Sequence, residues 1–419
     1  MHLKPGFNPP SIDNSCRLVH FRHPAYPDTE PDLLRLGALD RGNENGDGDG
    51  DGNGDGNGNG IQYDFALASC CVVTGNTFAN GWLATRVLPG NGQNPLFHRV
   101  SRPEDGILRD GEYHFCVGEE DPTTFKYPVI PSFDHWRFPH GHLPPPWNNL
   151  SVDLDAAHHS VPLKGKVAAL VRDGACRISG YGDAVEAAHL VPLTNGHWFS
   201  SNNMARYCRS PTDPHPINDE RNLITLRRDL HHLLDTRRFT LAAKPVPASP
   251  QPSSPTTPPP GAQLALHVTL PSPSGQLEDL YHNRALQPVR GIAVEFLFAR
   301  FAWTLFADET MPFLNGAVRH NVLLFDPAEG CLGEESLRAA EVHERAANVF
   351  EMCFSSRSVR PRKRPRLGCS LALTDAEDFE MGGCSVPPFD LDGSDEEEEG
   401  WDAGEVYDES DEEQRGRKR

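Results

Sequence analysis

The chain has 419 residues, of which 37% are hydrophobic, and its formal net charge is −20. This length allows two or three domains, each with a hydrophobic core of its own. The 37 glycines and 38 prolines indicate that much of the chain forms loops or disordered segments. The ten cysteines include no Cys-x-x-Cys pair, which argues against a zinc ribbon and against a secreted disulfide framework.

The negative charge is concentrated in two stretches of the chain. Residues 43–60 contain five carboxylates and no basic residue, and residues 370–419 contain 18 carboxylates and 4 basic residues. Residues 163–244, in contrast, contain 12 Lys or Arg and 8 Asp or Glu. This central segment is therefore mildly basic, and the acidity of the whole chain says little about what the segment binds.

The sequence shows no pattern of a secreted or membrane-spanning protein. Its first residues lack the apolar h-region of a secretory signal. The most apolar run, residues 292–307, contains Glu295 and Arg300 and is too short to span a bilayer. We therefore expect an intracellular protein of the nucleus or cytoplasm, with no membrane partner.

Residues 15–147 are expected to form a β-leaning N-terminal domain of unknown role. Residues 18–27 predict a strand that stops at proline, and residues 32–39 predict a short helix. Residues 64–73 fit a strand or a helix equally well. Within this domain, the Gly/Asp/Asn repeat 43–60 lacks the register of a calcium-binding loop and predicts a disordered loop.

Histidines alternate with aromatic residues and prolines near the end of this domain. They are His135, His140 and His142. Metal ligation is one interpretation of these side chains. We favour the other interpretation, structural histidines in a rigid connector rich in proline.

Residues 163–243 form the second expected domain. Its expected elements are, in chain order, a strand at 167–172, the beginning of another strand at 176–180, a short strand at 186–191 ended by Pro192, and a segment at 221–226 that leads into a helix ending at Asp235. In outline, the order is strand, strand, long loop and helix.

Ordered and low-complexity segments follow this domain. A Pro-rich linker is expected at 244–262, because its Pro/Ser/Thr composition cannot pack. Residues 263–310 predict a strand, at 263–270, and an apolar helix, at 291–306, that pack on the core. Residues 334–353 are a further candidate for a docked helix.

Residues 355–419 predict a disordered C-terminal tail with two charged clusters. The basic cluster Arg360–Arg366 has the composition of a nuclear import signal. The acidic run Asp395–Glu399 follows it and could bind a basic protein partner. The sequence gives no indication of the oligomeric state.

Four polar residues in the second domain have the spacing of a phosphodiester-cleaving site. Such a reaction needs an activated water, a cation on the scissile phosphate and a rigid arrangement of both. His189, at the end of an apolar strand, suits a general base, because an imidazole accepts a proton near neutral pH. His231 and Asp235 are four residues apart on a helix and point from one face, where they could share a metal ion. Asn222 could bond the backbone of the facing loop or orient His189.

Three further residues are candidates for substrate binding. Arg227 and Arg228 lie one turn before His231, on the side from which a phosphate would approach. His232 points about a quarter-turn away from His231 and is a candidate phosphate contact or a surface residue.

This arrangement resembles the HNH nucleases of the ββα-metal fold, and it is most similar to a subgroup found widely in fungal proteins. Four motifs carry the resemblance: Cys176-Arg-Ile-Ser-Gly180, Ala187-Ala-His189-Leu-Val-Pro192, Asn222, and Leu226-Arg-Arg-Asp-Leu-His231-His-Leu-Leu-Asp235. The strong likeness covers roughly residues 172–241. Weaker likeness extends to Phe21-Arg-His-Pro24 and to Leu297–Trp303. The resemblance implies an α+β chain in which a ββα-metal HNH module follows the β-leaning N-terminal domain, with a disordered linker and tail.

The resemblance also implies an activity and roles for individual residues. The activity is metal-dependent endonuclease cleavage of DNA, with His189 as general base, Asn222 as orienting residue and His231 as metal ligand. Asp235 is a second ligand by its position. The implied cofactor is a divalent ion, Mg²⁺ in the first place, with Mn²⁺ and Zn²⁺ as alternatives.

One residue departs from the pattern of many HNH enzymes, in which a metal-binding aspartate precedes the base histidine. Here that residue is Ala188. Either the remaining ligands and phosphate oxygens hold the ion, or Glu186 contributes through a water. Ala188 is also the main motive for an alternative function, a catalytically inactive HNH-fold binding or scaffold protein of the nucleus.

Overall fold

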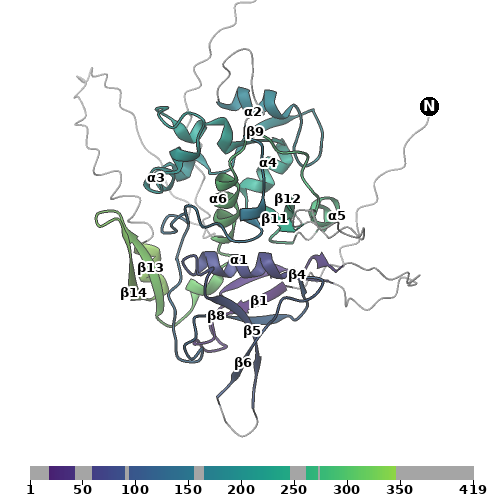
Figure 1. Cartoon of the computed structure of the whole chain (residues 1–419). Coiled ribbons are helices and arrows are strands. Elements are labelled where there is room, and N and C mark those ends of the chain that lie inside the picture. Colours follow the sequence, from purple (N-terminus) through teal and green to yellow (C-terminus); the bar gives the residue numbers. More distant parts are fainter. Residues whose placement is uncertain are drawn as a thin grey trace, which may run out of the picture. The chain divides into compact units, whose positions relative to one another are not determined.

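The computed structural model describes residues 18–42, 59–89, 94–154, 165–245, 261–271 and 274–345 (Figure 1). Helices and small sheets alternate along these residues, so the chain belongs to the α+β class, as expected. The segments predicted to be disordered lie outside the described residues, apart from a few residues at the edges of the Gly/Asp/Asn loop and of the linker. Within the described ranges, every helix is too short or too polar to cross a membrane.

A five-stranded sheet forms the centre of the N-terminal part. Its strands, in spatial order, are β2 (Leu34–Gly37), β1 (Leu18–Arg22), β8 (Glu112–Val117), β5 (Gly81–Val87) and β6 (Leu96–Arg99). β1 and β8 run parallel, and the other neighbouring pairs of this sheet are antiparallel. A smaller antiparallel sheet consists of β3 (Asp40–Arg41), β4 (Asn59–Gln62) and β7 (Ile107–Leu108).

The predictions for the N-terminal part are confirmed in one case and wrong in another. The strand expected within residues 18–27 is β1. The short helix expected at residues 32–39 is wrong, because this segment contains β2, whose leucines pair with buried residues of β1. The segment that fitted a strand or a helix is α1 (Tyr63–Val73). It ends before Gly75, whose φ of +82° suits a glycine.

Residues 165–245 consist of a helix, a hairpin with a long connection, and a second helix. In chain order these are α2 (Gly165–Asp173), β9 (Val185–His189), α3 (Gly196–Ser201), β10 (Leu223–Arg227), α4 (Arg228–Asp235) and β11 (Phe239–Pro245). β9 and β10 form an antiparallel pair. Short 3-10 helices occur at Trp147–Asn149, Leu193–Asn195, Met204–Tyr207, Pro216–Asn218, Glu220–Asn222 and Pro312–Asn315.

Two strands predicted in this part are wrong. Residues 167–172 belong to α2, because their alanines and leucine favour a helix and bury only one of its faces. Residues 176–180 form a turn, closed by a backbone hydrogen bond of 2.9 Å between the first and the last residue. The strand predicted before Pro192 and the helix predicted to end at Asp235 are confirmed as β9 and α4.

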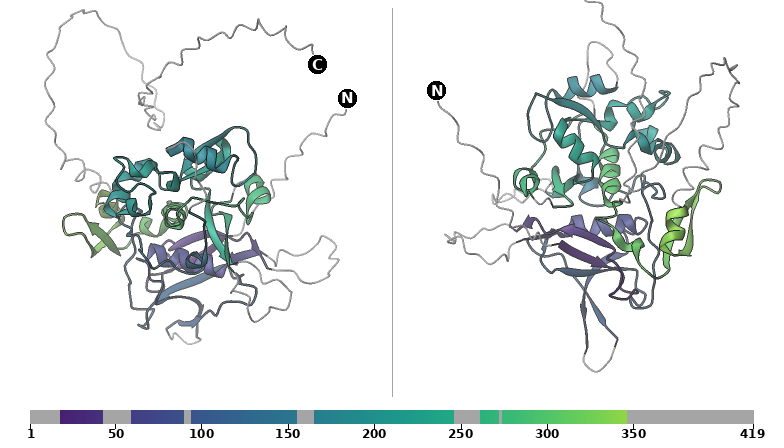
Figure 2. Two further views of the ribbon diagram at one scale, coloured as in Figure 1. Left: turned by 45° about the horizontal axis from the view of Figure 1, so that its top comes forward. Right: turned by 180° about the vertical axis from the view of Figure 1, so that it is seen from behind.

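The remaining elements follow β11. They are β12 (Ala262–Val268), α5 (Gln276–Tyr281), α6 (Val294–Leu305), β13 (His320–Asp326) and β14 (Cys331–Leu337). β11 pairs with β12, so both edges of the expected linker 244–262 belong to strands. β13 and β14 form a separate two-stranded sheet, drawn in yellow-green in Figures 1 and 2.

The strand and the apolar helix predicted after the linker are confirmed as β12 and α6. The helix expected at residues 334–353 is wrong at its beginning, because residues 334–337 belong to β14. Residues 339–345 are helical.

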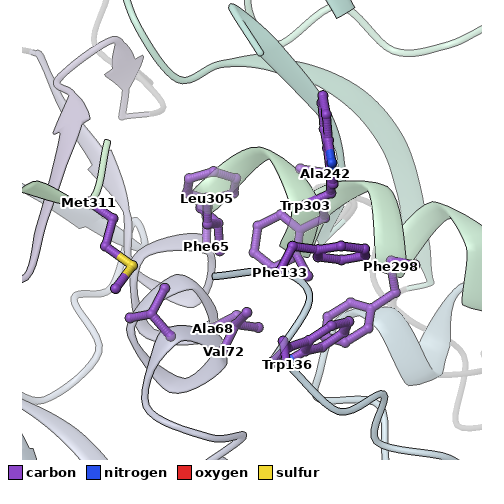
Figure 3. Close-up of a cluster of buried hydrophobic side chains, with 14 of the residues drawn as sticks. Phe65, Ala68, Val72, Phe133, Trp136, Ala242, Phe298, Trp303, Leu305 and Met311 are labelled. Carbon is purple, nitrogen blue, oxygen red and sulfur yellow. The ribbon is translucent and has the colours of Figure 1, made fainter. Parts of the chain in front are cut away.

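Helix α6 lies at the centre of the hydrophobic core. Its residues from Phe296 to Leu305 are all buried, and it packs against both α1 and β11. In Figure 3, Phe65 of α1 lies beside Leu305, while Phe298 of α6 faces Trp136. The ring centroids of Phe298 and Trp136 are 6.0 Å apart. One cluster of buried side chains therefore includes the N-terminal sheet, the β9–α4 segment and α6.

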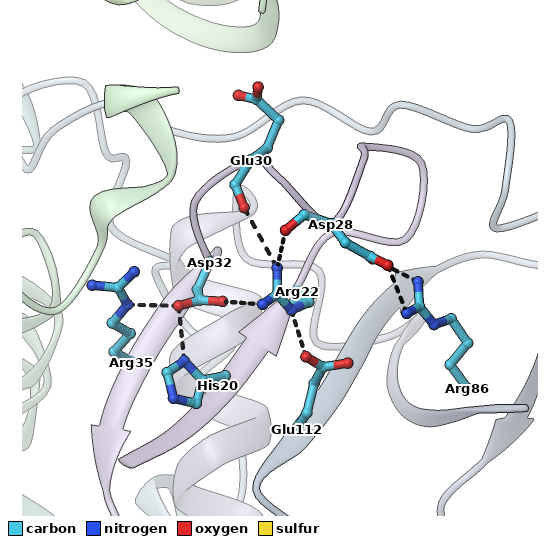
Figure 4. A network of polar contacts seen from close by, with 8 residues as sticks. All are labelled: His20, Arg22, Asp28, Glu30, Asp32, Arg35, Arg86 and Glu112. Carbon is cyan, nitrogen blue, oxygen red and sulfur yellow. Dashed lines mark hydrogen bonds and ion pairs between the residues drawn. The ribbon is translucent and has the colours of Figure 1, made fainter. Parts of the chain in front are cut away.

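A network of charged side chains holds the segment before β2 against β1 and β8. The buried carboxylate of Asp32 accepts hydrogen bonds from His20 (2.9 Å) and Arg35 (2.5 Å) and lies 3.5 Å from Arg22 (Figure 4). Arg22 also donates to Glu112 at 2.6 Å. Burial alone would raise the pKa of Asp32, but these donors outweigh it and lower that pKa. Such a paired network fixes geometry more than it adds stability, and we assign it a structural role.

Two of the three histidines in the proline-rich connector have structural contacts. The Nδ1 atom of His135 accepts a 2.9 Å hydrogen bond from the backbone N–H of Phe325. The ring of His140 bonds the hydroxyl of Tyr207 at 2.7 Å and the carbonyl of Asn202 at 2.8 Å. These contacts support the structural interpretation of the connector.

Buried neutral histidines make the stability of this fold depend on pH. Burial lowers the pKa of His135 and of His114 to about 4, and that of His23 to about 3. Below pH ~6.5 these histidines become protonated in the unfolded chain but stay neutral in the folded chain. We therefore expect the free energy of unfolding to fall between about pH 6.5 and pH 4, by up to ~1.4 kcal/mol per pH unit for each group.

Urea unfolding over this pH range tests the expectation with two variants. His135→Asn keeps an acceptor for the N–H of Phe325 but cannot titrate, so its stability should fall less steeply than that of the wild type. His215→Asn changes an exposed histidine and serves as the control. Equal slopes for His135→Asn and the wild type would contradict the account.

Candidate functional site

The hairpin β9–β10 and the helix α4 place the predicted residues. In the register of the hairpin, His189 pairs with Leu223 at one end, and Val185 pairs with Arg227 at the other. Helix α4 follows β10 without a loop and packs against both strands. Its Leu230 and Leu234 are fully buried, so the residues one position later, His231 and Asp235, lie on the neighbouring face.

His189 sits at the C-terminal end of β9 with its ring held by an unexpected partner. The Nε2 atom of His189 lies 3.1 Å from Oδ1 of Asn218, which accepts the hydrogen bond. Burial lowers the pKa of His189, and the bond to Asn218 offsets only part of this effect. The imidazole is therefore neutral near pH 7, as a general base must be before it accepts a proton.

Asn222 is completely buried and bonds the backbone that follows His189. Its Oδ1 accepts from the N–H of Val191 at 2.9 Å, while its Nδ2 donates to the carbonyls of Val191 (3.2 Å) and Ile217 (2.8 Å). Of the two roles expected for Asn222, the structure shows the bond to the facing loop. Its bonds reach Val191, two residues after His189, whereas Asn218 contacts the His189 ring directly.

His231 lies between two carboxylates that come from different elements. Its Nε2 is 3.1 Å from Asp235, one turn later on α4, and its Nδ1 is 2.9 Å from Glu186 on β9. The bond to Asp235, helped by Glu186, raises the pKa of His231 against the opposing effect of burial. The three side chains thus lie in a row, with the imidazole between two half-exposed carboxylates.

Glu186 occupies the face of β9 that Ala188 shares, because side chains two residues apart in a strand point the same way. Ala188 is fully buried and packs in the core, whereas Glu186 reaches α4. A carboxylate thus lies on the same face of β9, two residues before Ala188. In the structure the carboxylate of Glu186 contacts the His231 ring directly, whereas the sequence analysis considered a contribution of Glu186 through a water.

Part of this group offers donors for a divalent cation. Asp235 and the Nε2 atom of His231 lie on one side of the imidazole, while Glu186 lies at the other ring nitrogen. Two carboxylates and one imidazole offer the oxygen and nitrogen donors that Mg²⁺, Mn²⁺ and Zn²⁺ accept. Both ring nitrogens of His231 face a carboxylate, and these contacts raise the pKa of His231, so a proton competes with a cation for this group. His231 and Asp235 could hold a metal ion once Nε2 gives up its proton, and Glu186 would join them only after its side chain leaves Nδ1.

A buried arginine from outside this segment also contacts the site. Arg300 of α6 donates to the carbonyls of His189 (3.2 Å) and Leu190 (3.3 Å) and to Oδ1 of Asp235 (3.0 Å). Burial alone would raise the pKa of Asp235, but His231 and Arg300 outweigh it and lower that pKa. The sequence held one signal for this role, a charged residue inside an apolar run.

The predicted substrate-binding residues differ in how free they are. Both Nε and Nη2 of Arg227 donate to Asp229 at 2.6 Å, and its guanidinium lies 5.4 Å from the ring centroid of Tyr181. Arg228 has a side chain that is 76% exposed, and it lies 3.6 Å from Glu186. His232 is exposed on α4. Of the three candidates, Arg228 and His232 are therefore the more accessible to a bound phosphate.

A second group of potential metal ligands lies elsewhere in the core. Among the described residues, Asp40, His267 and His282 have ligand atoms within 4.8 Å of one another. Asp40 already accepts hydrogen bonds from Lys244 (2.9 Å) and Asn283 (2.7 Å). Asp40 and His267 are buried, and both carboxylate oxygens of Asp40 already accept hydrogen bonds, so we assign this group to a structural ion pair that joins β3 to β11.

Removing the amide of Asn222 should destabilise the fold. Asn222→Ala deletes three hydrogen bonds and leaves a buried N–H and two buried carbonyls without that partner. We expect a loss of about 2–4 kcal/mol in the free energy of unfolding, measured with urea. Asn218→Ala, which removes an exposed amide from the same loop, should cost less than about 1 kcal/mol. Equal losses for the two variants would contradict the role assigned to Asn222.

Comparison with known proteins identifies the segment that holds this site. Residues 176–242 match the family model described as HNH endonuclease. The match spans the elements from the turn before β9 to β11 and includes His189, Asn222, His231 and Asp235, but it ends before α6. Searches among curated proteins and among solved structures found no match. Residues 176–242 are therefore a segment of the HNH nuclease family.

Proposed function

We propose that this chain is a metal-dependent endonuclease that hydrolyses phosphodiester bonds in DNA. The observation that carries the proposal is the grouping of Glu186, His231 and Asp235 next to a strand end that bears a neutral His189. Family membership of the segment supports the reaction class, and the mildly basic composition of residues 163–244 supports a nucleic acid substrate.

His189 accepts the proton of the attacking water. Its Nε2–H is engaged by Asn218, so Nδ1 carries the lone pair that is available as a base. The water oxygen forms a bond to phosphorus as its proton moves to Nδ1, and the bond from phosphorus to the leaving oxygen breaks. The leaving oxygen takes a proton from solvent. Asn218 stabilises the imidazolium, because a hydrogen bond from a charged donor is stronger than one from a neutral donor.

The second half of the site binds the phosphate. His231 and Asp235 would hold a divalent ion, with Glu186 contributing through a water. The expected ion is Mg²⁺, with Mn²⁺ and Zn²⁺ as alternatives, and it would neutralise charge on the scissile phosphate. Arg228 and His232 lie on the exposed side of α4, where they can contact neighbouring phosphates. Arg227 stays a substrate-binding candidate, but any contact must compete with its bonds to Asp229.

A non-catalytic binding or scaffold protein is the second candidate function. The specific observation that favours it is Ala188, which is packed in the core where many HNH enzymes have a metal-binding aspartate. A nuclear location is proposed for either function from the basic cluster Arg360–Arg366, which lies outside the described residues.

Plasmid cleavage tests the proposed reaction. With Mg²⁺ or Mn²⁺ present, the wild type should nick or linearise plasmid DNA, and His189→Ala should be at least ~100-fold slower, because general base catalysis contributes about 10²–10⁴. His215→Ala, in an exposed histidine of the connection between β9 and β10, should match the wild type.

The same experiment separates the two candidate functions. Equal cleavage by His189→Ala and the wild type would refute the assignment of the base. A wild type that shifts DNA in a gel but cleaves none with either metal would favour the scaffold function.

A further inference from the structure

Arg300 contacts both halves of the proposed site from a helix outside the family segment. It belongs to α6, while the match to the HNH family ends at residue 242. Its side chain is fully buried, in a helix whose neighbouring residues are almost all apolar. A buried charge is costly unless it is well paired, so the contacts of this residue call for an explanation.

The contacts of Arg300 connect two groups whose separation matters for the reaction. Its Nη1 donates to the carbonyls of His189 and Leu190, at the end of β9 where the base is mounted. Its Nη2 donates to Asp235, on the metal-binding side. A guanidinium is planar and rigid, so one group holds these acceptors at a fixed distance.

A neighbouring aromatic ring holds the guanidinium itself. The Cζ atom of Arg300 lies 4.4 Å from the ring centroid of Trp303, one turn later on α6. Arg237 also lies over Trp303, at 4.0 Å, and donates to the carbonyl of Phe306. Arg237 makes a similar contact with α6 and touches none of the proposed site residues in these hydrogen bonds, so it offers a matched control.

We propose that Arg300 is a positioning residue that sets the spacing between the base His189 and the metal-binding carboxylate of Asp235. The inference rests on the proposed endonuclease function and extends it. If Arg300 has this role, the site is complete only when α6 is packed against the HNH segment. A fragment limited to the family segment lacks this contact.

The main test is Arg300→Lys in the full chain. A lysine keeps the positive charge, so its effect reports lost geometry and leaves the charge near the metal unchanged, but a single ammonium cannot hold all three acceptors in the fork arrangement. We expect kcat for plasmid cleavage to fall about 10–100-fold, with KM for DNA changed less than about 3-fold. Mn²⁺ binding, followed by calorimetry, should weaken about 10-fold or more at unchanged stoichiometry.

Arg237→Lys is the matched control and should leave kcat and the Mn²⁺ affinity near their wild-type values. If Arg300→Lys does not fold, Trp303→Phe is the second variant, because it loosens the guanidinium while keeping all its hydrogen-bond acceptors. We expect a drop of several-fold in kcat for Trp303→Phe, again with KM nearly unchanged.

The outcomes distinguish this inference from the proposed function. An active, Mn²⁺-binding wild type whose Arg300→Lys variant, or in its place Trp303→Phe, retains kcat and Mn²⁺ affinity would overturn the positioning role alone. A change equal to that of Arg237→Lys would also overturn it, because the effect would then be a general one on α6. A wild type without cleavage and without Mn²⁺ binding would overturn the proposed function and this inference with it.

Discussion

The burial of α6 is the constraint on which the rest of the described structure depends. Ten consecutive residues of this helix, from Phe296 to Leu305, are buried, so it needs neighbours on every side. Helix α1 and strand β11 supply two of them. The N-terminal sheet and the HNH segment thereby share one hydrophobic core. The packing against α6 holds β9 and α4, which carry the candidate site residues, in place.

Buried charges in this protein are balanced by polar groups on neighbouring elements. Asp32 and Asp40 are buried and surrounded by donors, including the arginines near Asp32 and Lys244 near Asp40. The group of Glu186, His231 and Asp235 is different, because two carboxylates face one imidazole and both are half-exposed. Arg300 and Arg228 offset the charge of these carboxylates, so the distinctive feature of the group is that solvent, and therefore an ion, can reach both of them.

The sequence predicted the strand and the helix that carry the candidate residues better than the elements around them. The spacing of His231 and Asp235 on a helix and the strand end at His189 could be recognised, because both depend on local periodicity. The segment 167–172 was predicted as a strand and is a helix, since a short apolar run fits either element until its tertiary contacts are known. Asn218 and Arg300 could not be assigned their partners, which lie 29 and more than 60 residues away in sequence.

The central claim is that a divalent ion binds between β9 and α4 and not at the other Asp/His group. Anomalous diffraction from crystals grown with Mn²⁺ tests it most directly. The account predicts a peak about 2.1 Å from the Nε2 atom of His231 and from a carboxylate oxygen of Asp235. A peak at Asp40, His267 and His282, or no peak beside His231 at saturating Mn²⁺, would contradict the account.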